Sequence, residues 1–507
     1  MNFIIFNPDE MRADHLGCYG HPISQTPNID RLASGGTRFA EAHCQNTVCT
    51  PSRCSVMTGW YPHVRGHRSL QHLLQPDEPN LLSYLKQAGY YVWWGGGHND
   101  LLAEESFEDS VSEYHDSNGH YHGQNPYDIS DPRYYSYLYS PVEGDVEDHG
   151  DQLMVKKATD FIRSKPDDPY VVYLPLIYPH CPYCAPQPWH DMYAPEDIPE
   201  LRPVDEQNRP SHHRLIRSYR RLDQIEESHF QKVNAVYLGM ISYVDFLLGQ
   251  ILDALEQSDQ ADNTCILFFS DHGDYAGDYG LVEKWSNGLE DVLTHVPLII
   301  RTPGGKPGHI VQEPVELFDV MATVLDLAQV DPTHVHFSRS QVPQLNGAAG
   351  DSDRAIFAEG GYDLHEPHCS AGYAGYVGER SDPRSIYTPK HLQLQQHPQS
   401  ASRSVMIRQN HQKLIYRTNG ENELYDLQAD PKELINRVSD PDCQSVVSHL
   451  RGQLLDWYLR TSDVTPLGAD PRGLPKKDYV EAHVPTSAKT ISNNPSVSEK
   501  DFVCSIR

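Results

Sequence analysis

The sequence predicts an α/β fold: a mostly parallel sheet with helices on both faces, followed by a small antiparallel sheet. Short apolar runs bounded by polar turns alternate with helix-like stretches, and a different pattern of short segments starts near residue 403. With 507 residues, the chain has room for a large domain and a smaller companion. We place these at residues 1–375 and 376–465, with an extended tail at 466–507.

The individual elements follow from these patterns. The expected strands of the large sheet are residues 3–6, 91–94, 170–177, 265–270, 298–301 and 356–358. The expected helices are residues 81–88, 154–163, 233–255 and 315–328. Residues 103–150 and 360–402 are polar and are expected to be long surface loops. Ligands of such a sheet collect where its strands give way to loops.

The smaller companion is predicted as an antiparallel meander closed by a helix. Its strands are residues 404–408, 413–417 and 423–427, with the turn residues Asn419 and Gly420 between the last two. A helix is expected at about residues 445–460.

The formal net charge of −29 limits the partners. Such a field repels nucleic acids and anionic membranes, so we expect neither as a partner. An anionic substrate would need local cations or a metal at its site. No stretch approaches the roughly 18–20 apolar residues of a membrane span. The apolar start at residues 3–6 is too short for a signal peptide, which predicts a cytoplasmic protein as written, or a periplasmic or secreted one if a leader was removed.

Residues 49–59 carry a candidate nucleophile. Pro51 favours the first helical position of a short helix and Gly59 its end, so Cys49 should lie at the helix N-terminus. Free backbone N–H groups and the helix dipole favour an anion there. This suits an activated cysteine, although a lone cysteine at a helix start is more often structural.

Three polar residues follow expected strands. Asp9 and Asp271 each come just after an apolar run, and His180 follows a third. Loops at the ends of parallel strands lie at the same edge of a sheet, so we expect these side chains to share one site. Carboxylate oxygens there suit a hard divalent cation.

Residues 48–62 resemble the signature of type I sulfatases, Cys-x-Pro-x-Arg extended by Thr-Gly-x-x-Pro. The resemblance implies an alkaline-phosphatase-like fold and hydrolysis of a sulfate ester. It further implies that a separate maturation enzyme oxidises Cys49 to formylglycine, whose hydrate attacks sulfur. Arg53 would help to hold that hydrate.

Residues 6–20 and 268–274 are similar to the metal-binding segments of the same family. The resemblance implies that Asp9, Glu10, Asp271 and His272 bind one divalent metal together with residue 49. Glu10 departs from the family, which has Asp or Gln at this position. Calcium suits the oxygen-rich set best, while the histidine nitrogen leaves manganese and magnesium open.

The remaining site residues also come from the resemblance. Lys284 matches the sulfate-binding lysine, and His180 matches a histidine that contacts the ester oxygen and is a candidate general acid. The family usually has Gly-Lys-x-His where this chain has residues 97–100. His98 and Asp100 therefore stand in the substrate-binding positions of lysine and histidine. Because the phosphonate monoester and phosphodiester hydrolase branch also lacks that pair, it remains the main alternative.

The sequence thus predicts a sulfatase that acts on a sulfated small molecule or oligosaccharide, with a carbohydrate sulfate preferred. A catalytically inactive protein that binds sulfated glycans is the alternative from another class. The spacing of Cys181 and Cys184 is that of thiol–disulfide oxidoreductases, but the prolines after it resist a helix, so we expect a loop. The tail after residue 466 can reach a neighbouring subunit, which leaves a homo-oligomer open.

Overall fold

The computed structural model describes residues 1–97, 99–117, 119–363, 366 and 382–464. An eight-stranded sheet forms its centre. The strand order is β10 (His309–Val311), β2 (Thr37–Phe39), β9 (Leu298–Arg301), β7 (Thr264–Phe269), β1 (Asn2–Asn7), β6 (Tyr170–Pro175), β4 (Tyr91–Gly95) and β5 (Glu113–His115). Only β9 runs antiparallel to its two neighbours, so the sheet is mixed but mostly parallel, as predicted.

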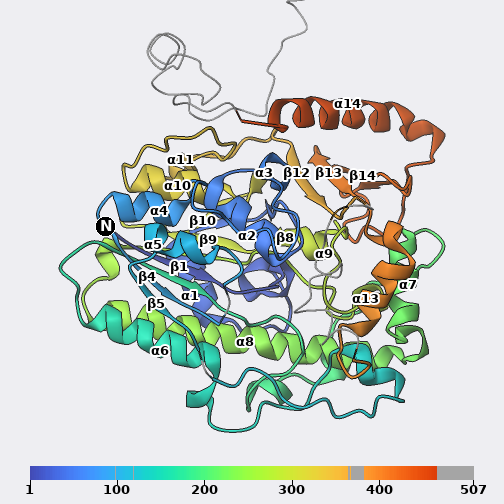
Figure 1. The fold of residues 1–507 in the computed structure, drawn as a ribbon, viewed down its shortest axis with the longest axis horizontal. Helices are drawn as coiled ribbons and strands as arrows, with labels where there is room; N and C mark the ends of the chain where they lie inside the picture. Colours follow the sequence, from blue (N-terminus) through green and yellow to red (C-terminus); the bar gives the residue numbers. More distant parts are fainter. Residues whose placement is uncertain (98, 118, 364–365, 367–381, 465–507) are drawn as a thin grey trace, which may run out of the picture.

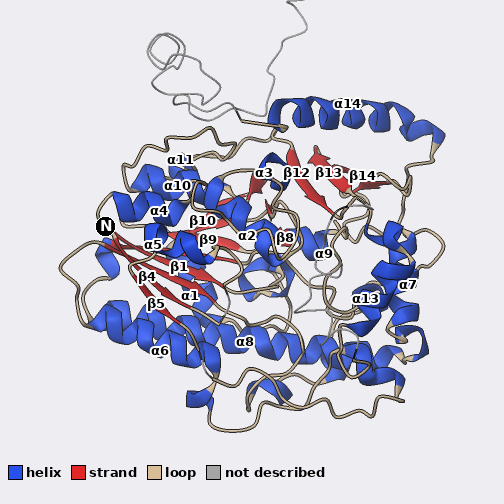
Figure 2. Ribbon diagram, in the orientation of Figure 1, coloured by secondary structure: helices blue, strands red, loops and turns tan. Residues whose placement is uncertain are grey.

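Helices cover both faces of this sheet (Figures 1 and 2). The α-helices of the described residues are α1 (Pro27–Gly35), α2 (Cys49–Thr58), α3 (Pro62–Arg65), α4 (Leu81–Gln87), α5 (Phe107–Ser110), α6 (Gly150–Arg163), α7 (Ser211–Tyr219), α8 (Glu227–Gln257), α9 (Asp291–Thr294), α10 (Asp319–Leu327), α11 (Val342–Leu345), α13 (Thr388–Gln396) and α14 (Gln444–Thr461).

The alternation of side chains along the strands separates two apolar cores. In β1, Ile4 and Phe6 pack with α1, α6 and α8, whereas Phe3 and Ile5 pack with α2, α4 and α10. Successive residues of a strand point to opposite faces, so a strand buried on both sides is apolar throughout. This is why the central strands appear in the sequence as continuous apolar runs.

Helix α8 lies in the first of these cores. Its mean hydropathy of 1.5 over an 18-residue window would suffice for a membrane span, but 89% of that window is buried inside the protein. The expectation that no stretch is apolar enough was therefore wrong. The physical reason is that a helix covered on all sides needs no polar face.

The C-terminal part contains a four-stranded antiparallel sheet. Its strands are β12 (Ile356–Gly360), β13 (Ser404–Gln409), β14 (Gln412–Arg417) and β15 (Glu423–Asp426). Helix α14 packs on this sheet in an apolar cluster that also contains Trp60 and Phe318 (Figure 1). The predicted meander and closing helix are both confirmed. A third, three-stranded sheet joins β11 (Val315–Glu316), β3 (Ala42–His43) and β8 (His295–Val296).

Several local expectations were wrong. Strand β12, expected in the large sheet, pairs with β13 instead. The helix expected from residue 315 begins at Asp319, because residues 315–316 pair with β3. The two expected loops contain regular structure, since β5 extends the sheet edge beside β4 and α13 lies within residues 360–402. The tail at 466–507 lies outside the described residues.

Candidate active site

The candidate active site lies at the carboxyl ends of three adjacent strands, β7, β1 and β6. Asp9 follows β1, His180 follows β6, and Asp271 follows β7. The Asp9 backbone N–H donates to the Tyr178 carbonyl at 3.3 Å, which ties the loops after β1 and β6 together. Parallel strands deliver their following loops to one edge of the sheet, which is the physical basis of the predicted shared site.

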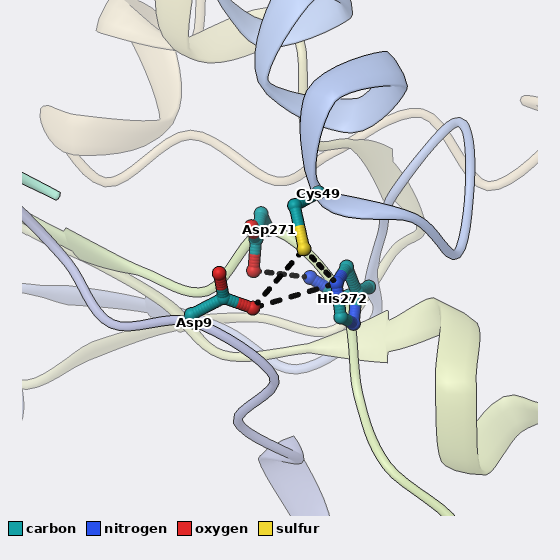
Figure 3. Close-up of side chains that lie close together, drawn as sticks. All are labelled: Asp9, Cys49, Asp271 and His272. Carbon is teal, nitrogen blue, oxygen red and sulfur yellow. Dashed lines mark hydrogen bonds and ion pairs between the residues drawn. The ribbon is translucent and has the colours of Figure 1, made fainter. Parts of the chain in front are cut away.

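Cys49 is the first residue of helix α2 and is 3% exposed. The helix ends, as predicted, at Gly59, which adopts the left-handed conformation (φ 67°). It begins two residues before the expected Pro51. The Cys49 Sγ lies 3.3 Å from His272 Nε2 and 3.5 Å from Asp9 Oδ1 (Figure 3). The thiol thus faces the loops after β1 and β7.

A possible metal site surrounds this thiol. Donor atoms of Asp9, Cys49, Asp271 and His272 all lie within 4.8 Å of one another, and all four side chains are buried (Figure 3). Carboxylate oxygens, an imidazole nitrogen and the atom at residue 49 form a donor set that suits a divalent cation. Oxygen would replace the thiol sulfur if the cysteine is oxidised to an aldehyde hydrate.

The orientation of these groups fits a metal. Arg53 donates from Nη2 to Asp9 Oδ2 at 2.9 Å and from Nε to Asp271 Oδ2 at 2.7 Å. The other oxygen of Asp9 is left facing Cys49 and His272. His272 Nδ1 bonds the Gly273 carbonyl at 2.9 Å, so the lone pair of Nε2 points into the cluster.

Burial and the charges around the cluster keep Asp9 and His272 in the protonation states that can bind a metal. Burial alone would raise the pKa of Asp9, but Arg53 and other nearby cations hold it below its usual value. Burial lowers the pKa of His272, which keeps the imidazole neutral. Burial, with smaller contributions from Asp9 and Asp271, raises the pKa of the Cys49 thiol well above its usual value. An unmodified Cys49 is therefore a weak nucleophile.

Glu10 belongs to a second polar group beside the first. Its Oε2 lies 3.1 Å from Lys284 Nζ and 3.3 Å from His180 Nε2, and those two nitrogens are 2.7 Å apart. Glu10 has a positive φ of 66°, and its carboxylate joins Lys284 and His180 while that of Asp9 joins the metal cluster. Its buried Oε1 makes no hydrogen bond to any described residue. A metal-ligand role for Glu10 stays a prediction.

Of the two residues expected at the leaving-group side, the structure describes Asp100. Asp100 lies close enough to Cys49 and Arg53 to influence the pKa of both, though less than burial does. His98 lies outside the described residues. Substrate binding by either residue stays a prediction.

The structure also adds residues that the sequence did not single out. Glu283 precedes Lys284 and pairs with Arg220 and Lys390, which come from distant parts of the chain. The residues next to Glu283 in the sequence carry no signal of contacts with segments so far away. Cys181 and Cys184 are both free thiols in a loop, as expected.

Solved structures of other proteins share the fold of this chain. The fold is alkaline-phosphatase-like: the structure of a phosphonate monoester hydrolase of Agrobacterium radiobacter superposes with a TM-score of 0.70 at 22% identity, covering 91% of this chain and 96% of that chain. The structure of BT4656 in complex with its substrate D-glucosamine-2-N,6-O-disulfate gives 0.69 at 22% identity, covering 91% and 98%.

The sequence comparison identifies the family. A sulfatase family model matches residues 1–330, and the chain belongs to that family. An arylsulfatase of Clostridium perfringens is 26% identical over 498 residues, 90% of this chain and 93% of that protein. The protein is thus a hydrolase of sulfuric esters. The family implies a divalent metal, for which the cluster of Asp9, Cys49, Asp271 and His272 offers the ligands.

Proposed function

We propose that the protein hydrolyses a sulfate monoester on a carbohydrate, through formylglycine at Cys49 and one bound Ca²⁺. The observation that carries this proposal is the position of Cys49, which opens helix α2 within 3.5 Å of both Asp9 and His272. Because its own thiol is a weak nucleophile there, a separate maturation enzyme would supply the reactive group as formylglycine.

Each neighbouring side chain then has a task. Arg53 holds the carboxylates of Asp9 and Asp271 in place. Lys284 binds a sulfate oxygen, and His180 protonates the leaving alcohol. Ca²⁺, when bound, would offset the negative charge of the sulfate group and favour deprotonation of the attacking hydroxyl. We prefer Ca²⁺ because carboxylate oxygens dominate the ligand set, with Mn²⁺ and Mg²⁺ as alternatives.

Two observations bear on the substrate. The BT4656 structure was solved with a sulfated glucosamine, which supports a sugar sulfate. The similarity to a phosphonate monoester hydrolase and the absence of the usual lysine–histidine pair at residues 98 and 100 favour a second candidate, a phosphonate monoester or phosphodiester hydrolase. Both candidates use the same nucleophile and metal.

Parallel kinetics on an aryl sulfate and an aryl phosphonate monoester test the proposal. We expect kcat/KM for the sulfate to exceed that for the phosphonate, and a panel of sulfated oligosaccharides to include one that loses sulfate.

The protein should be produced with a maturation enzyme, and mass spectrometry should find an aldehyde at residue 49. Cys49→Ala should abolish turnover, whereas the control Cys18→Ala, outside the site, should retain it. Higher efficiency on the phosphonate would refute the sulfatase assignment in favour of the second candidate.

A further inference from the structure

The residue before Lys284 is a buried carboxylate held between two cations. Glu283 is 2% exposed, and its Oε1 accepts a hydrogen bond from Lys390 Nζ at 2.7 Å. Its other oxygen pairs with Arg220. Burial opposes the charged form, but Lys390 and Arg220 keep the pKa of Glu283 below its usual value. The carboxylate is therefore ionised and needs both partners.

The backbone at Glu283 is also held from several sides. Its φ is 62°, in the left-handed region that costs a non-glycine residue of order 1 kcal/mol. The Glu283 N–H donates to the Tyr183 hydroxyl at 2.8 Å, and its carbonyl accepts from the Tyr275 N–H at 3.2 Å. Arg220 Nη1 donates to the preceding carbonyl, that of Val282, at 2.7 Å. These contacts fix the direction in which the chain enters Lys284.

Lys390 comes from helix α13, which lies beside α7 (Figure 1). The short 3-10 helix that follows α13, Pro398–Ala401, contacts the residue after Lys284, because Trp285 Nε1 donates to the Ser400 carbonyl at 2.8 Å. The Lys390 ammonium lies 5.7 Å from the centre of the Trp285 ring. The residues on both sides of Lys284 thus contact residues 388–401, more than 100 positions away in the sequence.

We propose that Lys390 is a positioning residue for Lys284, an inference that rests on the proposed role of Lys284 in binding the anionic group of the substrate. The Lys284 ammonium is directed toward Glu10 and His180, at 3.1 and 2.7 Å. Burial opposes the charged form of Lys284, but the surrounding anions, with a smaller contribution from Glu283, raise its pKa above the usual value. Without Lys390, the half-paired carboxylate of Glu283 competes with the substrate anion for that ammonium, so anion binding weakens.

The test compares Lys390→Met, which removes the charge, with Lys390→Arg, which keeps it. Steady-state kinetics on an aryl sulfate and calorimetric titration with inorganic sulfate are measured for each. For Lys390→Met we expect KM and the sulfate Kd to rise about tenfold, with kcat changed by less than about threefold. Lys390→Arg should restore both within about twofold. The control Lys156→Met breaks an exposed ion pair with Glu147 and should change neither.

Circular dichroism and the thermal midpoint show whether Lys390→Met folds; if it does not, Lys390→Gln replaces it. An unchanged sulfate Kd in the folded variant, or equal impairment in Lys390→Arg, would overturn the inference. The binding measurement also separates it from the proposed function. If the wild type cleaves no sulfate ester but Lys390→Met still weakens sulfate binding, the proposed function fails and the positioning role stands.

Discussion

Two buried aspartates of the possible metal site share Arg53 as the cation that hydrogen-bonds both. Arg53 bridges Asp9 and Asp271 in a dry environment, and Lys284 adds a more distant positive charge beside Asp9. Buried charges that lack full compensation are costly. A divalent cation would supply the missing charge and would use the oxygen of Asp9 that Arg53 leaves free.

We therefore expect chelation to lower both turnover and the thermal unfolding midpoint. A metal at a thousand times its Kd stabilises the folded state by about 4 kcal/mol. Differential scanning fluorimetry after EDTA treatment, with Ca²⁺, Mn²⁺ or Mg²⁺ added back, measures the shift and ranks the metals. Asp271→Asn should lose the shift, whereas Asp253→Asn, in an exposed ion pair with Arg31, should keep it. A chelated wild type with an unchanged midpoint would contradict the assignment.

Helix α2 depends on glycine at its C-terminal end. Gly59 has a φ of 67°, and a Cβ there would lie 2.7 Å from Ser338 Oγ and 2.9 Å from Met321 Cε. The end of the helix therefore packs closely against the segment after α10. This contact fixes the C-terminal end of α2, and Cys49 lies at the N-terminal end of the same helix.

Gly59→Ala should lower the free energy of unfolding by about 2–3 kcal/mol, of which about 1 is the left-handed conformation and the rest crowding. Gly89→Ala is the matched control, because Gly89 also has a positive φ (91°) but nothing lies within 4 Å of the added Cβ. It should cost about 1 kcal/mol. Denaturant titration of both variants measures the difference. An equal loss of unfolding free energy in both variants would mean that the residues around Gly59 move aside without strain.

At the scale of the whole molecule, a polar network joins the two parts of the chain. His43 in β3 accepts a hydrogen bond from Arg408 of β13 at 3.0 Å, and Arg408 also pairs with Asp291 and Glu41. His43 is fully buried and stacks on His295. Burial and the positive charge of Arg408 lower the pKa of His43, with a smaller contribution from His295. Glu41 and Asp291 act in the opposite direction, and the resulting pKa is about 4.

This histidine should make the protein sensitive to acid. Unfolded His43 binds a proton below its ordinary pKa of about 6.5, whereas the folded form stays neutral down to about 4. Its contribution to stability is thus complete above pH 6.5 and is lost as the pH falls toward 4. Between pH 7.5 and 5 the loss is about 2 kcal/mol.

The variant His43→Gln keeps an acceptor for Arg408 but does not titrate. Its free energy of unfolding, from denaturant titrations between pH 5 and 7.5, should fall about 2 kcal/mol less than that of the wild type. The control His449→Gln, exposed on α14, should follow the wild type. Parallel curves for wild type and His43→Gln would show that the residue does not titrate on unfolding.

The sequence by itself determined the central sheet, the C-terminal meander and the meeting of Asp9 and Asp271, whereas the place of Cys49 beside them followed from the family resemblance. Each depends on local patterns: apolar runs set the buried strands, and carboxylates directly after strands must lie at the sheet edge. Helix α2 with Cys49 at its start was likewise readable from Pro51 and Gly59.

Only the tertiary structure decided which contacts form between distant segments. It paired β12 with β13, directed Glu10 toward Lys284 and His180, and brought Arg220 and Lys390 to Glu283. Such pairings depend on how separate elements pack, and neither spacing nor composition records that. The cluster of Asp9, Cys49, Asp271 and His272 could therefore be expected from the sequence, whereas the contacts around Lys284 come from the fold.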